Sequence, residues 1–301
     1  MENNTIANVT TTASSEEVEK LHKSFYPATL IYGSLPYRPI ESNLWVRENG
    51  RNRTAITAGA ITNPDGTVES FIPSGKLARA ALLYLTTEAK KTGSPRIDLS
   101  KSYRGFLKDL GLKWDSKTAK NAEKQLRAVL SMTINVSITE HRENGDTKIT
   151  EYDLMVGRGR EIVFDANADI KERESYLLLS DDFFESVIQS NAVPVETETW
   201  RELLSESKSP LALDIYLWLS SRLPQLQAPL YINWEQLQAQ FGSQAQEIHD
   251  FKRRFRVALK EVQGHLPGAN VTEEGQGKGK QSGFKGLVLR PSKRSLASKR
   301  S

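Results

Sequence analysis

The stretch FKRRFRVALKEV (251–262) predicts a helix with two adjoining faces of different character. Successive helical positions turn by about 100°, so residues on one face recur every three or four positions. The apolar residues share roughly a third of the circumference: Phe251, Phe255, Ala258, Leu259 and Val262. The basic residues cluster on the adjacent third, with Arg254 apart from them: Lys252, Arg253, Arg256 and Lys260. One face is therefore expected in a core and its neighbour to be strongly positive.

The elements around this stretch can be read from turn and cap signals. Upstream, Ser209 is suited to cap a helix that has Pro210 in its first position. A short extended segment follows, and then a helix that starts at Asn233 and stops at Gly242. Downstream, two extended segments flank the glycine-rich turn GQGKGKQSG (275–283), which predicts a β-hairpin.

An equivalent series occurs in the first half of the chain. It comprises a helix at 75–91, a short strand at 96–99, a helix closing at Gly111, a helix at 117–132, and a hairpin over 133–156. Asp115 or Ser116 is suited to cap the third of these helices, and Asn144-Gly145 marks the hairpin turn. The two series also share residues, with LG at 110–111 matching FG at 241–242 and RAVL at 127–130 matching RVAL at 256–259.

The order of helix, strand, helix, helix and hairpin is that of a winged helix-turn-helix unit. We therefore predict an α+β fold with two winged helix-turn-helix domains in tandem, the product of an internal duplication. The expected divisions are a disordered N-terminal segment at 1–24, a first domain at 25–170, a second at 171–292 and a basic tail at 293–301.

The charge distribution favours a polyanionic partner. The chain of 301 residues has a formal net charge of +4, and no acidic residue follows Glu274. An acid-free basic end is typical of proteins that bind nucleic acid or an acidic membrane surface. There is no cysteine, no apolar run of the roughly 20 residues that a membrane span needs, and no signal-peptide pattern at the N-terminus. These features predict a cytoplasmic protein without disulfides.

The winged-helix interpretation assigns double-stranded DNA as the ligand and divides the basic residues by role. Arg253 and Arg256 are expected at base edges in the major groove, because arginine pairs bidentately with guanine. Phosphate contacts are expected from the rest of that helix and from its hairpin: Lys252, Lys260, Lys278, Lys280 and Lys285. The first series offers an equivalent set on its third helix and after its hairpin: Lys117, Lys120, Lys124, Arg127, Arg158 and Arg160.

Several segments together resemble plasmid-encoded RepA replication initiators. They include LARAALLYLTTEAKKTGSPRIDL (77–99), YLLLSDDFFESVIQSNAVPVE (176–196), SPLALDIYLWLSSRL (209–223), INWEQLQAQFG (232–242) and DFKRRFRVALKEV (250–262), and the similarity covers roughly Leu77 to Ser292. The resemblance implies binding to repeats at a plasmid origin, melting of an adjacent segment, and recruitment of host replication proteins such as an initiator and a helicase. It also implies a homodimer that represses the protein's own promoter. The tail at 293–301 departs from the family's pattern.

Catalysis and cofactor binding are not expected. Lys280 is followed by Gln281, which breaks the phosphate-loop pattern, and the histidines His22, His141, His249 and His265 are too far apart for a His-x-His metal pair. The acidic Asp181 and Asp182 behind Ser180 favour a helix N-terminus over a metal site. Two alternatives use the same fold: a winged-helix transcriptional regulator without a replication role, and a protein-binding scaffold.

Overall fold

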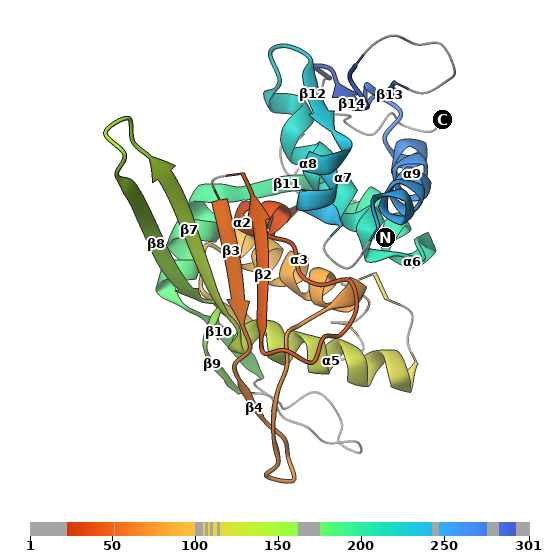
Figure 1. Cartoon of the computed structure of the whole chain (residues 1–301). Helices are drawn as coiled ribbons and strands as arrows, with labels where there is room; N and C mark the ends of the chain where they lie inside the picture. Colours follow the sequence, from red (N-terminus) through yellow and green to blue (C-terminus); the bar gives the residue numbers. More distant parts are fainter. Residues whose placement is uncertain are drawn as a thin grey trace, which may run out of the picture.

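The computed structural model describes residues 23–50, 52–99, 105, 108, 111–112, 115–161, 175–242, 247–275 and 283–292. They form a mixed fold of helices and β-sheets in which every strand pairing is antiparallel, in agreement with the α+β class (Figure 1). Residues 1–22 and 293–301, which include most of the segment expected to be disordered and all of the basic tail, lie outside this description. Lys23 and Ser24 lie in a strand, so the expectation of disorder is wrong for these two residues.

The second half contains the predicted series of elements. They are α7 (Pro210–Arg222), β12 (Leu230–Asn233), α8 (Trp234–Phe241), α9 (Ile248–His265), β13 (Val271–Glu274) and β14 (Gly286–Leu289). The strands form a sheet of order β12-β14-β13, so the last strand lies between the other two. Leu289 pairs with both Leu230 and Val271, and its buried side chain joins the core below the helices.

The helix expected to close at Gly111 lies largely outside the described residues, but the first half contains the other helices and strands of an equivalent series. It contains α3 (Gly75–Thr92), β6 (Arg96–Asp98), α5 (Ser116–Ser131), β9 (Gly157–Glu161) and β10 (Tyr176–Leu179). The sheet order is β6-β10-β9, and again the last strand is central. Asp115 accepts a hydrogen bond from the Thr118 amide at 2.8 Å, which identifies Asp115 as the cap of α5.

The long hairpin of the first half belongs to a different sheet. Strands β7 (Thr133–His141) and β8 (Thr147–Met155) form the expected hairpin, with Gly145 at a φ of 88° in its turn. They extend β2 (Leu44–Asn49) and β3 (Asn52–Thr57) into a four-stranded sheet of order β2-β3-β7-β8, which lies at the left of Figure 1. The equivalence of this hairpin with the β13–β14 pair is therefore wrong. Buried Ile56 of β3 pairs with buried Ile134 of β7, and β9 and β10 take the equivalent place.

A small hairpin lies over α5. It consists of β4 (Ala60–Thr62) and β5 (Val68–Ser70), and β4 contacts the helix. Ile61 of β4 and Ala128 of α5 are both buried. The second half has no counterpart of this hairpin over α9 among the residues that the structure describes.

Strands and helices of the two halves are interleaved. Strand β1 (Lys23–Pro27) pairs with β11 (Ala192–Glu196) over its whole length. Near this pair lie α2 (Ala28–Tyr32), the π-helical turn η2 (Phe183–Gln189) and α6 (Thr197–Glu206). The expected boundary at 170–171 falls outside the described residues, and β10 beyond it pairs with β6 and β9. The division into 25–170 and 171–292 stays a prediction.

A buried ion pair joins the two halves. Arg79 of α3 donates to both carboxylate oxygens of Asp214 on α7, at 2.6 and 2.8 Å, and both side chains are buried. The same guanidinium donates to the carbonyls of Leu35, Pro36 and Gly75. Burial alone would lower the pKa of Arg79, but the carboxylate of Asp214 raises it overall. A charge without these partners would be costly in such a setting, so the pair fixes α3, α7 and the 35–36 loop together.

Candidate nucleic-acid interface

Helix α9 is positioned by α8 and by a close approach at Gly242. Asn233 caps α8 by accepting from the Gln236 amide at 2.8 Å, and the Gln236 side chain accepts from the Asn233 amide at 3.0 Å. This reciprocal pair satisfies donors that a helix start leaves open. A Cβ at Gly242 would lie 2.9 Å from both the Gln238 carbonyl and the Phe251 ring, so glycine permits α9 to pack against the end of α8.

The apolar face of α9 enters the core as the sequence predicts. Its members are all buried: Phe251, Phe255, Ala258, Leu259 and Val262. Trp234 of α8 meets the ring of Phe255 edge-on, with centroids 5.8 Å apart. Trp218, Tyr216 and Trp234 are buried in the same core, so they pack in the interior and do not present faces for stacking on bases.

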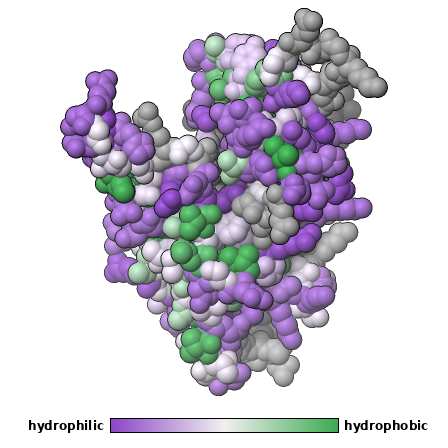
Figure 2. All heavy atoms as spheres, viewed as in Figure 1, coloured by the Kyte–Doolittle hydropathy of each residue, from purple (hydrophilic) through white to green (hydrophobic). Residues whose placement is uncertain are grey.

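The opposite side of α9 is open to solvent. Arg253, Val257 and Lys260 are exposed there, and Val257 retains 68% of its accessible surface. Arg253 makes an exposed ion pair with Asp250 one turn earlier, at 3.1 Å. Exposed pairs of this kind contribute about 1 kcal/mol or less, so a phosphate or a base edge can compete for the guanidinium. Figure 2 shows a mainly hydrophilic surface in this region, whereas hydrophobic patches lie over the β2–β3 part of the molecule.

Lys252 and Arg256, the other two basic residues of the predicted face, lie on the side of α9 nearer the β12-β14-β13 sheet, which is called its sheet side. Arg256 donates to both oxygens of Glu273 on β13, the shortest contact being 2.7 Å, and this hydrogen-bonded carboxylate raises the pKa of Arg256. Its guanidinium also lies 5.1 Å from the centroid of the Trp234 ring, and the Lys252 ammonium lies 5.6 Å from it. Arg256 is thus held by the protein in this structure, whereas Arg253 lies at the centre of the exposed face.

The basic residues of α5 are less available than those of α9. Lys117 and Lys120, in its first turns, are exposed. Lys124 is half exposed and is paired with Glu69 of β5, and its ammonium lies 4.8 Å from the centroid of the Phe71 ring.

The prediction that Arg127 lies on an exposed basic face is wrong. Its guanidinium is buried beneath β4, where it donates to the Thr62 carbonyl and to the Asn63 side chain. Helical spacing places Arg127 beside the lysines, and only the β4–β5 hairpin, which no local pattern links to α5, reveals that the position is covered.

The remaining predicted contacts have different surroundings. Arg158 is exposed and paired with Asp181 at 2.6 Å, whereas Arg160 is partly buried. Desolvation, followed by repulsion from Arg127, lowers the pKa of Arg160. Lys285 is exposed just before β14, and Lys278 and Lys280 lie outside the described residues. Ser180 accepts from the Phe183 amide at 3.1 Å, which confirms the capping interpretation of the acidic stretch.

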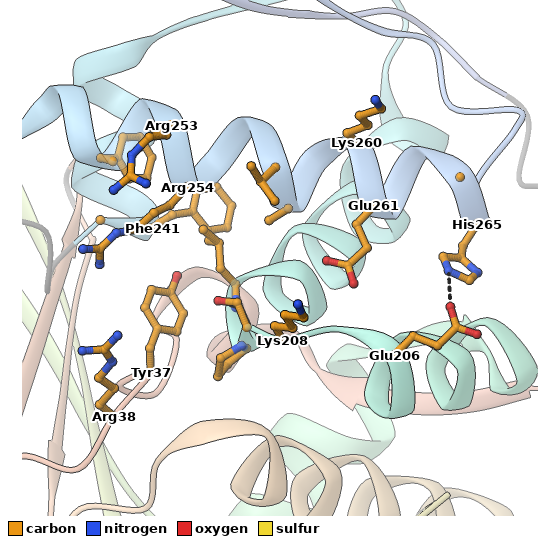
Figure 3. Close-up of a pocket in the computed structure, with 18 of the residues that line it drawn as sticks. Tyr37, Arg38, Glu206, Lys208, Phe241, Arg253, Arg254, Lys260, Glu261 and His265 are labelled. Carbon is orange, nitrogen blue, oxygen red and sulfur yellow. Dashed lines mark hydrogen bonds and ion pairs between the residues drawn. The ribbon is translucent and has the colours of Figure 1, made fainter.

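A groove of about 1270 Å³ runs along α9 on the side away from β13. Its far wall is formed by residues 37–39 of the first half and by residues 206 and 208–211, from the end of α6 to the start of α7. Figure 3 shows Arg38, Arg253 and Arg254 at one end of the groove, and His265 with Glu206 at the other. Arg38 and Lys208 were not expected at this site, because both lie in loops where no periodicity marks them. Arg254 lies on α9, and the sequence predicts no role for it.

The described part of the chain offers neither a metal centre nor a membrane-spanning helix. Its residues contain no group of three or more His, Asp or Glu side chains arranged to hold a metal ion. No helix there is both long enough and apolar enough to span a lipid bilayer.

The fold is similar to that of solved structures of RctB. A crystal structure of selenomethionine derivatives of domain 2 and domain 3 of RctB has a TM-score of 0.53 and 13% sequence identity, and the similarity covers 87% of this chain and 98% of that one. A second structure of RctB domains 2-3 gives a TM-score of 0.52, also at 13% identity, covering 87% and 96%. At this identity the likeness concerns the fold alone. No curated protein matches the sequence.

The family follows from the sequence itself. The model of the RepA_C family, described as plasmid encoded RepA protein, matches residues 72–236, which is more than half of the chain. The protein belongs to this family, and the resemblance drawn from the sequence is confirmed. The matched region runs from the residues just before α3 into α8.

Proposed function

We propose that the protein initiates plasmid replication by binding repeated sequences in origin DNA, without catalysis of its own. The observation that carries the proposal is the exposed face of α9, with Arg253 at its centre, in a unit that follows the winged-helix order of elements. In such units the second helix of the helix-turn-helix enters the major groove, and a hairpin contacts flanking phosphates. Membership of the plasmid-encoded RepA family supports the replication role.

The roles of individual residues follow from the geometry of α9. Arg253 is proposed to contact a base edge, with Lys260 beside it. Val257, the exposed apolar residue between them, suits contact with a thymine methyl group. Lys285, with Lys278 and Lys280 of the same hairpin, is proposed to bind phosphates. In the first half Lys117, Lys120 and Arg158 are proposed as secondary contacts, and host replication proteins and a promoter-repressing dimer remain part of the proposal.

Footprinting on the DNA that flanks the gene tests the proposal. We expect protection of tandem repeats at regular spacing, and we expect the purified protein supplied in trans to support replication of a plasmid that carries those repeats. Protection of a single promoter site, with no replication in trans, would instead indicate a transcriptional regulator. Failure to retain any of this DNA at low salt would indicate a protein-binding scaffold and would reject DNA binding altogether.

A further inference from the structure

The groove beside α9 has a strongly cationic end built from both halves of the chain. Arg253 and Arg254 reach it from α9, and Arg38 reaches it from the loop that follows α2 (Figure 3). All three are exposed. Three guanidinium groups around one hollow are suited to an anion, and arginine binds phosphate in a planar, bidentate manner.

The two acidic residues that line the groove, Glu206 and Glu261, lie nearer its other end (Figure 3), whereas Arg253 is paired with Asp250 of α9. The Oε2 atom of Glu206 lies 3.4 Å from Nε2 of His265, and Figure 3 places both residues at the opposite end. Glu261 accepts a hydrogen bond from the Ser207 hydroxyl at 3.3 Å. Among the residues that the structure describes, Arg254 and Lys208 have no acidic partner within ion-pair distance.

The loop that carries Arg38 is held rigidly. The carbonyls of Leu35 and Pro36, immediately before it, accept from the buried Arg79, and the Gly75 amide donates to the Pro36 carbonyl at 3.0 Å. Since Arg79 is locked to Asp214 of the second half, Arg38 is presented at a fixed place relative to α9. Preorganised contacts lose less conformational entropy on binding than contacts from a mobile loop.

The position of this cationic end relative to α9 indicates which anion it takes. A helix in the major groove of B-form DNA, which is about 12 Å wide, has a phosphate strand on each side. The sheet-side flank of α9 carries Lys252 and Arg256, together with the hairpin that contains Lys285. The other flank carries Arg254 and faces Arg38.

We infer that Arg38 and Arg254 together bind the phosphate strand on the side of α9 opposite the β13–β14 hairpin. The first half of the chain thereby contributes directly to the DNA contact of the second, and Arg254 gains a role. This inference rests on the proposed function, because it takes α9 to be the helix that enters the groove. Phosphate contacts carry affinity and salt dependence but no sequence information.

The test is the salt dependence of binding, measured by fluorescence anisotropy on an origin duplex and on a scrambled duplex of equal length. Arg38→Ala and Arg254→Ala should each make the slope of log K against log salt shallower by about 0.9, the value for one lost phosphate contact on B-DNA. Both duplexes should lose affinity by the same factor. The reversal Arg38→Glu should weaken binding further than Arg38→Ala does.

The matched control is Arg142→Ala, which removes the same charge from an exposed position in the turn of the β7–β8 hairpin, away from α9. Its slope should equal that of the unaltered protein, and all variants should retain its melting temperature. If the unaltered protein binds DNA and Arg38→Ala leaves the slope unchanged, the inference is overturned and the proposed function still stands. A loss confined to the origin duplex also overturns it, because Arg38 would then read bases. Absence of binding by the unaltered protein overturns the proposed function itself.

Discussion

Helices α5 and α9 are the two helices that the predicted series match to each other, yet their outer faces have different surroundings. When the shared RAVL and RVAL segments are aligned, Ala128 corresponds to Val257. Ala128 is 1% exposed and Val257 is 68% exposed, because the β4–β5 hairpin lies over α5 and nothing equivalent lies over α9 in the described residues. Of these two helices with similar sequences, α5 is therefore partly covered and α9 is open. The β4–β5 hairpin, and not the sequence of the helix, makes this difference.

The equivalent arginines show the same contrast in finer detail. Arg127 of α5 is buried and donates to Thr62 and Asn63, so it has become part of the packing between helix and hairpin. Arg256 of α9 is 45% exposed and binds Glu273 on the neighbouring strand. Both arginines make contacts within the protein. Only Arg256 is exposed enough to exchange its carboxylate partner for another group while the protein stays folded.

The largest expected effect is on stability, when glutamate replaces Ala128 or Val257 in two separate variants. Ala128→Glu buries an unpaired charge between α5 and β4, which should lower the free energy of unfolding by about 3–5 kcal/mol. Val257→Glu lies in solvent between Arg253 and Lys260, so it should change that free energy by less than about 0.5 kcal/mol while weakening DNA binding. Urea unfolding measures both. Equal losses at the two sites would contradict the contrast between a covered and an open helix.

The next effect concerns DNA recognition. Arg253→Ala should lower discrimination between an origin repeat and a scrambled duplex by about 1–3 kcal/mol, because it removes a proposed base contact. Lys124→Ala, the equivalent change on α5, should leave discrimination unaltered, since Lys124 is paired with Glu69. Competition binding with the two duplexes provides the measurement. A larger loss from Lys124→Ala would mean that the first half reads the sequence.

The smallest effect is expected from releasing Arg256. Glu273→Gln removes an ion pair with a partly exposed arginine, so the free energy of unfolding should fall by about 1 kcal/mol or less. DNA affinity should rise, because a negative charge leaves the sheet-side flank of α9 and Arg256 becomes available.

The control for this change is Glu274→Gln, which removes the same charge one residue later, where the partner is Arg290 at 3.0 Å. Successive residues of a strand face opposite sides of the sheet, so this variant should raise affinity less. Weaker binding by Glu273→Gln would show that the Arg256–Glu273 pair is itself needed to present α9.

Local patterns were enough to predict much of the second half. The burial of Phe251 and Phe255, the capping of α8 by Asn233 and its end near Gly242 all follow from side-chain spacing and cap chemistry, and the structure confirms them. These features depend on residues within one or two helical turns of each other. The turn at Asn144-Gly145 was predicted for the same reason.

The errors concern contacts between segments far apart in the sequence. Alternation predicts that β7 and β8 are strands, but it contains no information that β7 pairs with β3 rather than with β6. In the same way, the spacing of Arg127 reports its angle on α5, while its burial depends on residues 62 and 63. The groove was missed because one of its walls, at residues 37–39, comes from a loop without any repeat pattern.

The pairing of β1 with β11 has a consequence for how the chain can be divided. These strands form a sheet of their own, and Phe25 of β1 also donates to Thr87 of α3 at 2.8 Å. A fragment that begins after Pro27 would therefore leave β11 with both edges bare, and bare edges recruit strands from other chains. Strand β1 thus connects β11 of the second half to α3 of the first half. The two halves are therefore better studied by substitutions in the intact chain than by truncation.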